Sequence, residues 1–327
     1  MTDTMLAATL KDYGGPLQIG HVPRPKPAAG QILIKLEASG VCHSDVHVWK
    51  GGLRPPSHPV PFILGHEGVG RVAALGAGVA DWCVGERAGA AWIHNACGVC
   101  DECVAGEASF CQTHNAHGFN MPGTFAQYVV ADARFAARLP EGDAALLAPL
   151  LCAGLTAYGA LKRAEIKAGE TVAIFGCGGL GLYGVQLAHR LSARVIAVDR
   201  DAAKVQLAVA FGAEASAPDS KAHVCINFAP TPATWPLMVK MIRPRGRIIA
   251  AAMVPEPVGL NQEWLTGTGV RITGTSVGTR AQMAELMALH ARTPLHSEVT
   301  RITLHEATQA LTALDQGLAK GRYCIVF

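Results

Sequence analysis

The chain has 327 residues, of which 50% are hydrophobic and 16% are charged, and this balance excludes an intrinsically disordered protein. The length allows two domains that each bury a core of their own. The net charge of +3 is close to zero and no block of five like charges occurs, so we expect no nucleic-acid partner.

Two uncharged stretches, residues 144–161 and 171–188, have the length of a short membrane span. Pro149 and several glycines interrupt them, so we expect buried elements of a globular core and no membrane partner. The N-terminus lacks the basic segment of a signal peptide, which predicts a cytoplasmic protein. Thiols stay reduced in that compartment, so the ten cysteines indicate metal binding or catalysis before disulfides.

The first 140 residues contain short apolar runs bounded by glycine and proline, which predict the strands of a β-rich domain. These strands are expected at residues 31–36, 69–75, 87–93 and 125–130. From about Asp143, helical and strand patterns alternate, which predicts an α/β fold with a doubly wound parallel sheet.

The predicted elements of this second part follow in chain order. Helices are expected at residues 144–161, 182–191, 202–211, 280–290 and 304–316. Strands are expected at residues 171–175, 194–199, 223–228, 247–252, 271–275 and 322–327.

One connection in the parallel sheet is short. Only residues 212–222 separate the helix at 202–211 from the strand at 223–228. We expect that a short strand near residues 214–217 cannot reach a parallel neighbour through this connection, since a crossover takes a dozen or more residues. The sheet is therefore predicted to lack one crossover helix.

A glycine-rich turn, Gly176-Cys177-Gly178-Gly179-Leu180-Gly181, follows the predicted strand at 171–175 and precedes a helix. The spacing G-x-G-x-x-G alone also fits an ordinary turn. The strand before it, the helix after it and Asp199 at the end of the next strand favour a dinucleotide site. The backbone N–H groups of this turn are expected to bind a pyrophosphate at the helix N-terminus.

Asp199 is expected to bind the ribose hydroxyls of the adenosine and to repel a 2′-phosphate. The sequence therefore favours NAD over NADP, although Arg200, a further candidate cofactor-binding residue, stands next to Asp199. The missing crossover helix is expected close to the adenine, which leads to the hypothesis of an open adenine pocket and a weak affinity for NAD.

Four cysteines have the spacing C-x2-C-x2-C-x7-C, which favours a closed structural zinc site. They are Cys97, Cys100, Cys103 and Cys111. Disulfides and a zinc module that binds nucleic acid are the alternatives. No lysine or arginine lies between the first and last of these cysteines, which argues against the nucleic-acid module.

Cys42, His66 and Cys152 form a second candidate set. Two cysteines and one histidine leave a tetrahedral zinc ion one open position, as a catalytic metal requires. Taken singly, each has a plainer reading as a buried cysteine or a structural histidine. Beside a nucleotide fold, the set indicates a catalytic zinc site.

With these motifs in this order, the chain resembles the zinc-dependent medium-chain alcohol dehydrogenases, closest in pattern to the yeast and bacterial enzymes. The resemblance implies a GroES-like catalytic domain at residues 1–150 with a zinc lobe at 97–111. It also implies a Rossmann NAD-binding domain at 151–275, a return to the catalytic domain at 276–327, and a homo-tetramer. Two zinc ions and NAD are the implied cofactors.

The implied reaction is the oxidation of primary or secondary alcohols to aldehydes or ketones, and its reverse, by hydride transfer from a zinc-bound alkoxide. Glu67 is implied as an occasional zinc ligand and Asp45 as the partner that fixes the His66 tautomer. Ser44 is implied to pass the alcohol proton through the cofactor ribose to His47.

The remaining assignments also come from the resemblance. His43 and Arg322 match residues that face the pyrophosphate, and Thr156 matches one beside the nicotinamide. Leu53 and Trp92 match residues that line the alcohol pocket. Because yeast enzymes carry a tryptophan where Leu53 stands, we expect room for medium-chain or aromatic alcohols. A polyol dehydrogenase, a zinc-free quinone reductase and a non-catalytic nucleotide-binding relative are the alternatives.

Overall fold

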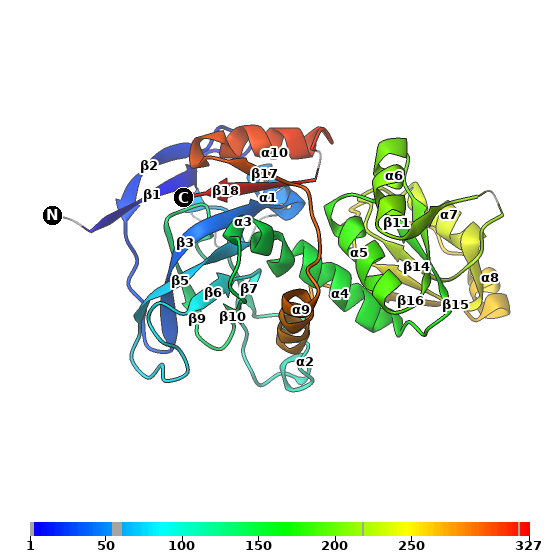
Figure 1. Ribbon diagram of the computed structural model, residues 1–327, viewed down its shortest axis with the longest axis horizontal. Coiled ribbons are helices and arrows are strands. Elements are labelled where there is room, and N and C mark those ends of the chain that lie inside the picture. Colours follow the sequence, from blue (N-terminus) through cyan, green and yellow to red (C-terminus); the bar gives the residue numbers. More distant parts are fainter. Residues whose placement is uncertain (1–2, 54–60, 218, 320) are drawn as a thin grey trace. The chain divides into compact units, whose positions relative to one another are not determined.

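The computed structural model describes residues 3–53, 61–217, 219–319 and 321–327 (Figure 1). The chain forms two compact units. The first unit combines residues 1–152 with residues 279–327, and the second is the continuous segment 153–278. The chain thus leaves the first unit once and returns to complete it.

A seven-stranded sheet is the frame of the first unit, with the order β10-β6-β5-β3-β18-β17 and with β9 also paired to β3. Its strands are β3 (Gln31–Val41), β5 (Gly68–Leu75), β6 (Arg87–Ala90), β9 (Tyr128–Asp132), β10 (Ala137–Arg138), β17 (Val299–Ile302) and β18 (Arg322–Val326). Alternate residues of β3, among them Ile32 and Ile34, are buried against Val72 and Trp82. This alternation is the pattern that places one face of a strand in a core.

Smaller elements complete the first unit. A three-stranded sheet has the order β2-β1-β4, and β7 pairs with β8. These strands are β1 (Thr4–Leu10), β2 (Gln18–Pro23), β4 (Phe62–Ile63), β7 (Ile93–Asn95) and β8 (Asn115–Ala116). The helices are α1 (His43–Trp49), α2 (Asp101–Val104), η1 (Ala108–Phe110), α3 (Ala144–Leu147), η2 (Ala148–Leu151), α9 (Arg280–Arg292), η3 (Leu304–Glu306) and α10 (Ala307–Asp315).

The second unit is a parallel sheet with the order β13-β12-β11-β14-β15-β16, which confirms the predicted doubly wound fold. Its strands are β11 (Thr171–Phe175), β12 (Arg194–Val198), β13 (Ala213–Ala215), β14 (Ala222–Asn227), β15 (Ile242–Ala250) and β16 (Arg271–Gly274). Its helices are α4 (Ala153–Ala164), α5 (Gly179–Arg190), α6 (Ala202–Ala210), α7 (Thr234–Met241) and α8 (Gln262–Thr268).

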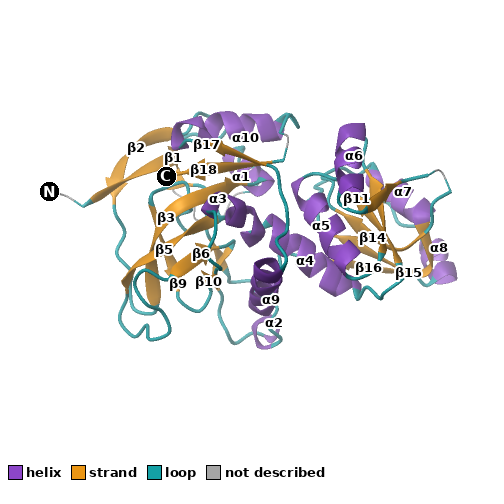
Figure 2. Cartoon of the chain, in the orientation of Figure 1, coloured by secondary structure: helices purple, strands orange, loops and turns teal. Residues whose placement is uncertain are grey.

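Helices lie on both faces of this sheet (Figure 2). Met238 and Met241 of α7 pack on the face that presents Ala173 and Phe175. Helix α5 lies on the opposite face, where the backbone of Gly184 comes close to Ile174. Because both faces of β11 are covered, all five of its residues are buried.

The prediction of one helix over residues 144–161 is wrong. The stretch forms α3, η2 and α4, and Cys152 interrupts it with a non-helical φ of −125° and ψ of −67°. Pro149, near the start of η2, has no N–H group to continue a helical ladder. An apolar sequence pattern predicts that a segment is buried but does not predict a break within it. The break places Cys152 between two helical segments.

In the described parts of the chain, no individual helix has both the length and the apolar character to cross a membrane. One bent pair, Ala144–Leu151 with Ala153–Ala164, meets the length and composition criteria jointly, with a 42° bend. Most residues of this pair are buried in the protein.

The expectation about the short strand is wrong in one respect. β13 does form, and it pairs in parallel with β12, which it reaches through the preceding helix α6. Residues 216–221 then lead to β14, three strand positions away, and their described members carry no helix. The described residues of this link form a turn, in which the Ser220 N–H donates to the Ala217 carbonyl at 3.0 Å. They contain no helix, as the prediction of a missing crossover helix requires.

Candidate functional site

The structure brings Cys42, His66, Glu67 and Cys152 together in the first unit. One potential ligand atom from each lies within 4.8 Å of the others, and all four residues are buried. Cys42 caps the N-terminus of α1, His66 and Glu67 lie between β4 and β5, and Cys152 is the break between η2 and α4. Three segments far apart in sequence therefore converge on one point.

The two thiols fit a metal ion. The Sγ atoms of Cys42 and Cys152 are 3.8 Å apart. Thiolates at about 2.3 Å from a tetrahedral zinc ion stand about 3.8 Å apart. The His66 Nε2 atom is buried and has no nitrogen or oxygen partner among the described residues, so it is left for a ligand.

Asp45 fixes the orientation of His66. Its Oδ1 atom lies 2.9 Å from His66 Nδ1, and its Oδ2 atom accepts a hydrogen bond of 2.8 Å from the Cys42 backbone N–H. One buried carboxylate therefore orders two of the candidate ligands. A histidine whose Nδ1–H donates to a carboxylate presents Nε2 as its metal-binding atom.

The electrostatics of the cluster favour a cation. A hydrogen bond from the Cys152 thiol lowers the pKa of Cys42 well below its ordinary value, against the opposing effect of burial. Burial alone would lower the pKa of His66, but Asp45 raises it well above the ordinary value. Burial raises the pKa of Glu67 to about 7, while Arg322 opposes this rise.

Arg322 lies in β18 and forms a buried ion pair with Glu67. Only 4% of the arginine surface is exposed, and its Nε atom has no partner in the described part of the chain. The family resemblance implied that Arg322 faces the pyrophosphate of the cofactor. It did not indicate the pairing with Glu67, because the two residues are 255 positions apart.

Helix α1 carries the three residues predicted for the proton relay and for cofactor contact. Ser44 Oγ lies 3.8 Å from Cys42 Sγ. The rings of His43 and His47 meet edge to face with centroids 5.1 Å apart. Burial, assisted by the charge of His43, lowers the pKa of His47. All three side chains are half-buried, so each remains accessible from solvent.

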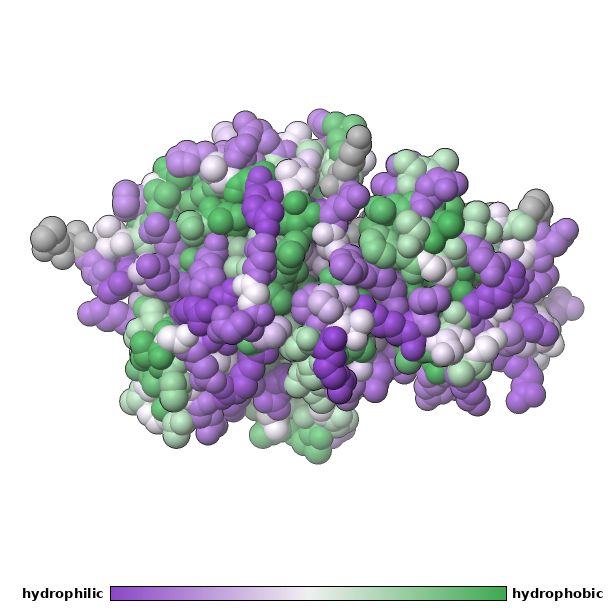
Figure 3. Space-filling view, viewed as in Figure 1, coloured by the Kyte–Doolittle hydropathy of each residue, from purple (hydrophilic) through white to green (hydrophobic). Residues whose placement is uncertain are grey.

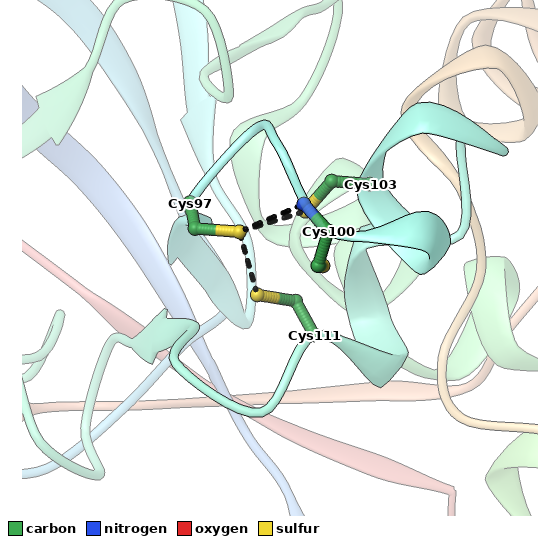
Figure 4. A group of neighbouring side chains, drawn as sticks. All are labelled: Cys97, Cys100, Cys103 and Cys111. Atoms are coloured by element: carbon green, nitrogen blue, oxygen red, sulfur yellow. Dashed lines mark hydrogen bonds between the residues drawn. The ribbon is translucent and has the colours of Figure 1, made fainter.

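The four cysteines of the predicted lobe also converge (Figure 4). The Sγ atom of Cys97 lies 3.7 Å from that of Cys111 and 3.9 Å from that of Cys103. The backbone N–H groups of Val99 and Cys100 point at the same sulfur, at 3.5 and 3.4 Å. These spacings match those expected of four thiolates around one zinc ion.

The lobe exposes apolar side chains. Val99 and Val104 are 81% and 77% exposed, and hydrophobic atoms lie at the lower edge of the space-filling view, over α2 (Figure 3). The short elements α2 and η1 bury little hydrophobic surface of their own, because Ser109 is their only buried residue. The cysteine cluster is therefore the principal device that can hold this lobe in shape.

In the second unit, the glycine-rich turn has the geometry of a phosphate-binding turn. Gly176 has a φ of +87°, and a Cβ atom there would come within 2.7 Å of the Ala229 nitrogen. A Cβ atom at Gly181 would overlap the carbonyl oxygen of Gly176, so α5 can approach β11 only without one. A Cβ atom at Gly178, the N-cap of α5, would meet nothing within 4 Å, which leaves room for a ligand.

The other predicted cofactor residues of this unit lie in three settings. The two oxygens of Asp199 accept hydrogen bonds from the backbone N–H groups of Cys177 at 2.7 Å and Asp201 at 3.0 Å. This fixes its carboxylate beside the turn. Arg200 is exposed, and Thr156 is buried in α4.

The chain matches two protein-family models. The alcohol dehydrogenase GroES-like domain matches residues 28–141, and the zinc-binding dehydrogenase model matches residues 179–292. An alcohol dehydrogenase of Rhizobium meliloti (strain 1021) is 36% identical over 98% of both chains. One of Moraxella sp. (strain TAE123) is 35% identical over 98% of this chain and 99% of the relative.

The chain belongs to the zinc-type medium-chain alcohol dehydrogenases. The acetophenone reductase from Geotrichum candidum in complex with NAD has a similar structure, with a TM-score of 0.90 and 30% identity over 100% of this chain and 98% of that one. Alcohol oxidoreduction with zinc and a nicotinamide cofactor, acting on a small alcohol or aldehyde, follows from this membership.

Of the two residues predicted for the alcohol pocket, Trp92 lies beside the candidate metal ligands. Its ring meets the His66 ring edge to face at 5.0 Å. Leu53 packs on the hydrophobic cluster of α1 and α10 and follows the relay helix, with its N–H bonded to the His47 carbonyl at 3.1 Å. The adjoining residues 54–60 lie outside the described chain.

Phe119 is a site residue that sequence reasoning missed. Its ring stacks on Trp92 with centroids 5.7 Å apart and an angle of 28°. The aromatic pair therefore extends outward from His66. A single phenylalanine after Gly118 carries no motif, and only the register of the fold reveals its place.

Proposed function

We propose that this alcohol dehydrogenase is zinc- and NAD-dependent, with a catalytic zinc ion at Cys42, His66 and Cys152 and a structural one at Cys97, Cys100, Cys103 and Cys111. The observation that carries the proposal is the buried set of two thiols and one imidazole, with the imidazole held by Asp45. Its substrates are primary or secondary alcohols, and the aldehydes or ketones of the reverse reaction.

The donor set supports an open metal site. Two thiolates and one neutral imidazole leave one position for substrate, and Glu67 stands close enough to occupy it in turn. When bound, zinc supplies the Lewis acidity that lowers the pKa of an alcohol, and the nicotinamide supplies a hydride acceptor.

The proposed proton path begins at Ser44 and ends at His47. A serine hydroxyl can accept and donate in the same step, and Ser44 stands beside Cys42. His47 is half-buried on the same helix, and its lowered pKa keeps the imidazole neutral and able to take up a proton near pH 7.

The proposed cofactor site uses Gly176, Gly178, Gly179, Leu180 and Gly181 for the pyrophosphate. Asp199 binds the ribose and disfavours a 2′-phosphate, and Arg200 beside it is proposed as a further cofactor-binding residue. His43, Thr156 and Arg322 are proposed to complete the site. Arg322 can do so only with the guanidinium N–H groups that Glu67 does not use. The cofactor domain is proposed to be residues 151–275.

The proposed substrate pocket is walled by Trp92, Phe119 and Leu53. The aromatic pair supplies flat apolar surface beside His66, which suits medium-chain and aromatic alcohols. The enzyme is further proposed to be a cytoplasmic homo-tetramer, in keeping with its family.

The test is the formation of reduced nicotinamide with alcohols from ethanol to hexanol and benzyl alcohol, with NAD and NADP in parallel. The zinc content of the same sample is measured before and after chelation. We expect two zinc ions per chain, chelator-sensitive turnover with NAD, and rising kcat/KM along the alcohol series.

The parts of the proposal fail separately. Turnover that persists without zinc contradicts the metal assignment, and a preference for NADP contradicts the role of Asp199. Efficiency that falls steadily from ethanol to benzyl alcohol contradicts the pocket. Inactivity with every alcohol and both cofactors favours the non-catalytic alternative.

A further inference from the structure

Gly40 occupies a position in β3 where the backbone does not require glycine. Its φ is not in the left-handed region, it is buried, and it pairs with Cys324 of β18. Glycine inside a strand weakens it and commonly marks a place where another group comes close. The reason for a glycine at this position must therefore lie in its surroundings.

The group that comes close is the carboxylate of Glu67. A Cβ atom on Gly40 would overlap Oε2 of Glu67 and would stand 2.9 Å from its Cδ and 3.1 Å from its Cβ. The two residues are also joined by a hydrogen bond of 3.1 Å from the Gly40 N–H to the Glu67 carbonyl. The Glu67 carboxylate thus occupies the space that a side chain at position 40 would need.

This carboxylate has little freedom to move elsewhere. Glu67 is 0% exposed, and its Oε1 atom is paired with the buried Arg322. Its Oε2 atom, the one that faces Gly40, has no hydrogen-bond partner in the described chain. The carboxylate is buried, one of its oxygens is unpartnered, and an oxygen of it lies within 4.8 Å of two thiols and an imidazole, which suits a cation.

We propose that Gly40 is a positioning residue for the metal centre. Because it has no side chain, the Glu67 carboxylate can lie within reach of the ion bound by Cys42, His66 and Cys152. The inference rests on the proposed function, since it assumes a divalent metal at these ligands. Gly40 touches neither metal nor substrate and acts through Glu67 alone.

The first test is zinc release from Gly40→Ala to a chromogenic chelator. The added methyl group displaces a negative charge from the ion, so we expect zinc to leave the Cys42 site about tenfold faster. The four-cysteine site of the same molecule is an internal reference, and its release should not change.

Gly246→Ala is the matched control. Gly246 is another buried strand glycine without positive φ, and a Cβ atom there would meet Ile242 side-chain atoms at 2.6 and 2.7 Å. It lies in the second unit, so its substitution should lower the melting temperature without changing release from either zinc site. Equal acceleration in both variants overturns the inference.

The second test is a double-mutant cycle with Glu67→Ala. If Gly40 acts through the carboxylate, Gly40→Ala adds nothing to zinc release once that carboxylate is gone. Gly40→Ala should also lower the melting temperature less in the Glu67→Ala protein than in the wild type, because the crowded group is absent there. This comparison remains decisive where the single variant folds poorly. Independent, additive effects overturn the inference.

Cobalt substitution gives a readout that packing alone does not change. The visible spectrum of Co²⁺ at the Cys42 site should differ between the wild type and Gly40→Ala. Identical spectra in the two proteins would contradict the inference. If the wild-type protein binds zinc only at the four cysteines, the proposed function itself is wrong. If it binds two zinc ions and Gly40→Ala changes neither zinc release nor the cobalt spectrum, only this inference is wrong.

Discussion

Asp45 and His66 form a buried pair in which Asp45 Oδ1 lies 2.9 Å from Nδ1 of the imidazole. Neither side chain is more than 1% exposed. The second oxygen of Asp45 is already occupied by the N–H of Cys42 at 2.8 Å. The pair therefore couples the cap of α1 to the orientation of a proposed metal ligand.

Replacement of this carboxylate should weaken the metal site. In Asp45→Asn the charge is lost and only one oxygen remains to serve two donors. We expect the affinity of the His66 site for zinc to fall about 10- to 100-fold, measured by chelator competition. Asp315→Asn is the control, because Asp315 is a partly exposed partner of Lys50. Unaltered affinity in Asp45→Asn would show that His66 needs no such anchor.

The lobe should depend on its metal for stability. Cys103→Ser removes one of four thiolates from an otherwise weakly packed segment. We expect the zinc content to fall from two ions to one, with a loss of about 2 kcal/mol in the free energy of unfolding and a melting temperature lower by about 4–8 °C. Cys83→Ser, at an exposed cysteine outside the cluster, should change neither quantity. A stable lobe without zinc would mean that packing suffices.

Asp199 should decide the choice of cofactor. Asp199→Asn keeps an acceptor for the Cys177 N–H but removes the charge that opposes a 2′-phosphate. We expect KM for NAD to rise about tenfold, which is about 1.4 kcal/mol, and the ratio of kcat/KM for NAD over NADP to fall. Asp219→Asn, an exposed residue of the same unit, serves as the control. If the ratio is unchanged, the discrimination lies elsewhere.

A buried histidine pair should make the protein acid-sensitive. His117 Nε2 lies 3.0 Å from His94 Nδ1, and burial lowers the pKa of His117 from 6.5 to about 4. The unfolded chain therefore takes up a proton at a higher pH than the folded one, so stability is present above pH 6.5 and is lost as the pH falls toward 4.

Between pH 7 and pH 5 this histidine should cost about 2 kcal/mol of unfolding free energy, measured by urea denaturation. His117→Asn should be less stable at pH 7 and should lose less on acidification by about that amount. Parallel losses in both proteins would assign the acid sensitivity to other groups, such as the zinc ligands that the two proteins share.

Features with a local signature were predictable from sequence. Strand β11 and the turn after it follow from an apolar run and fixed glycine spacing, and the structure begins and ends that strand at the predicted residues. The four lobe cysteines are close in sequence, so their spacing alone indicated a cluster. Cys42, His66 and Cys152 could be grouped only by their ligand chemistry and the neighbouring nucleotide fold, because no spacing rule joins residues so far apart.

Features that depend on tertiary contact were not predictable. The ion pair of Glu67 with Arg322 and the space at Gly40 exist only because β18 pairs with β3. Strand β1, helix α7 and helix α8 were also missed. Helix α7 contains Pro236 and helix α8 contains Gly267, residues that weaken a helical pattern which packing then stabilises.

The division of the chain has a consequence for its synthesis. The second unit is one continuous segment and can fold as soon as it leaves the ribosome, whereas the first unit waits for β18, whose residues 323–326 pair with residues 38–41 of β3. Until then β3 carries an open edge, which is a surface for chaperones or for aggregation. A chain that stops before Arg322 contains every proposed zinc ligand but lacks the arginine that pairs with Glu67, so we expect the site to stay incomplete until β18 is in place.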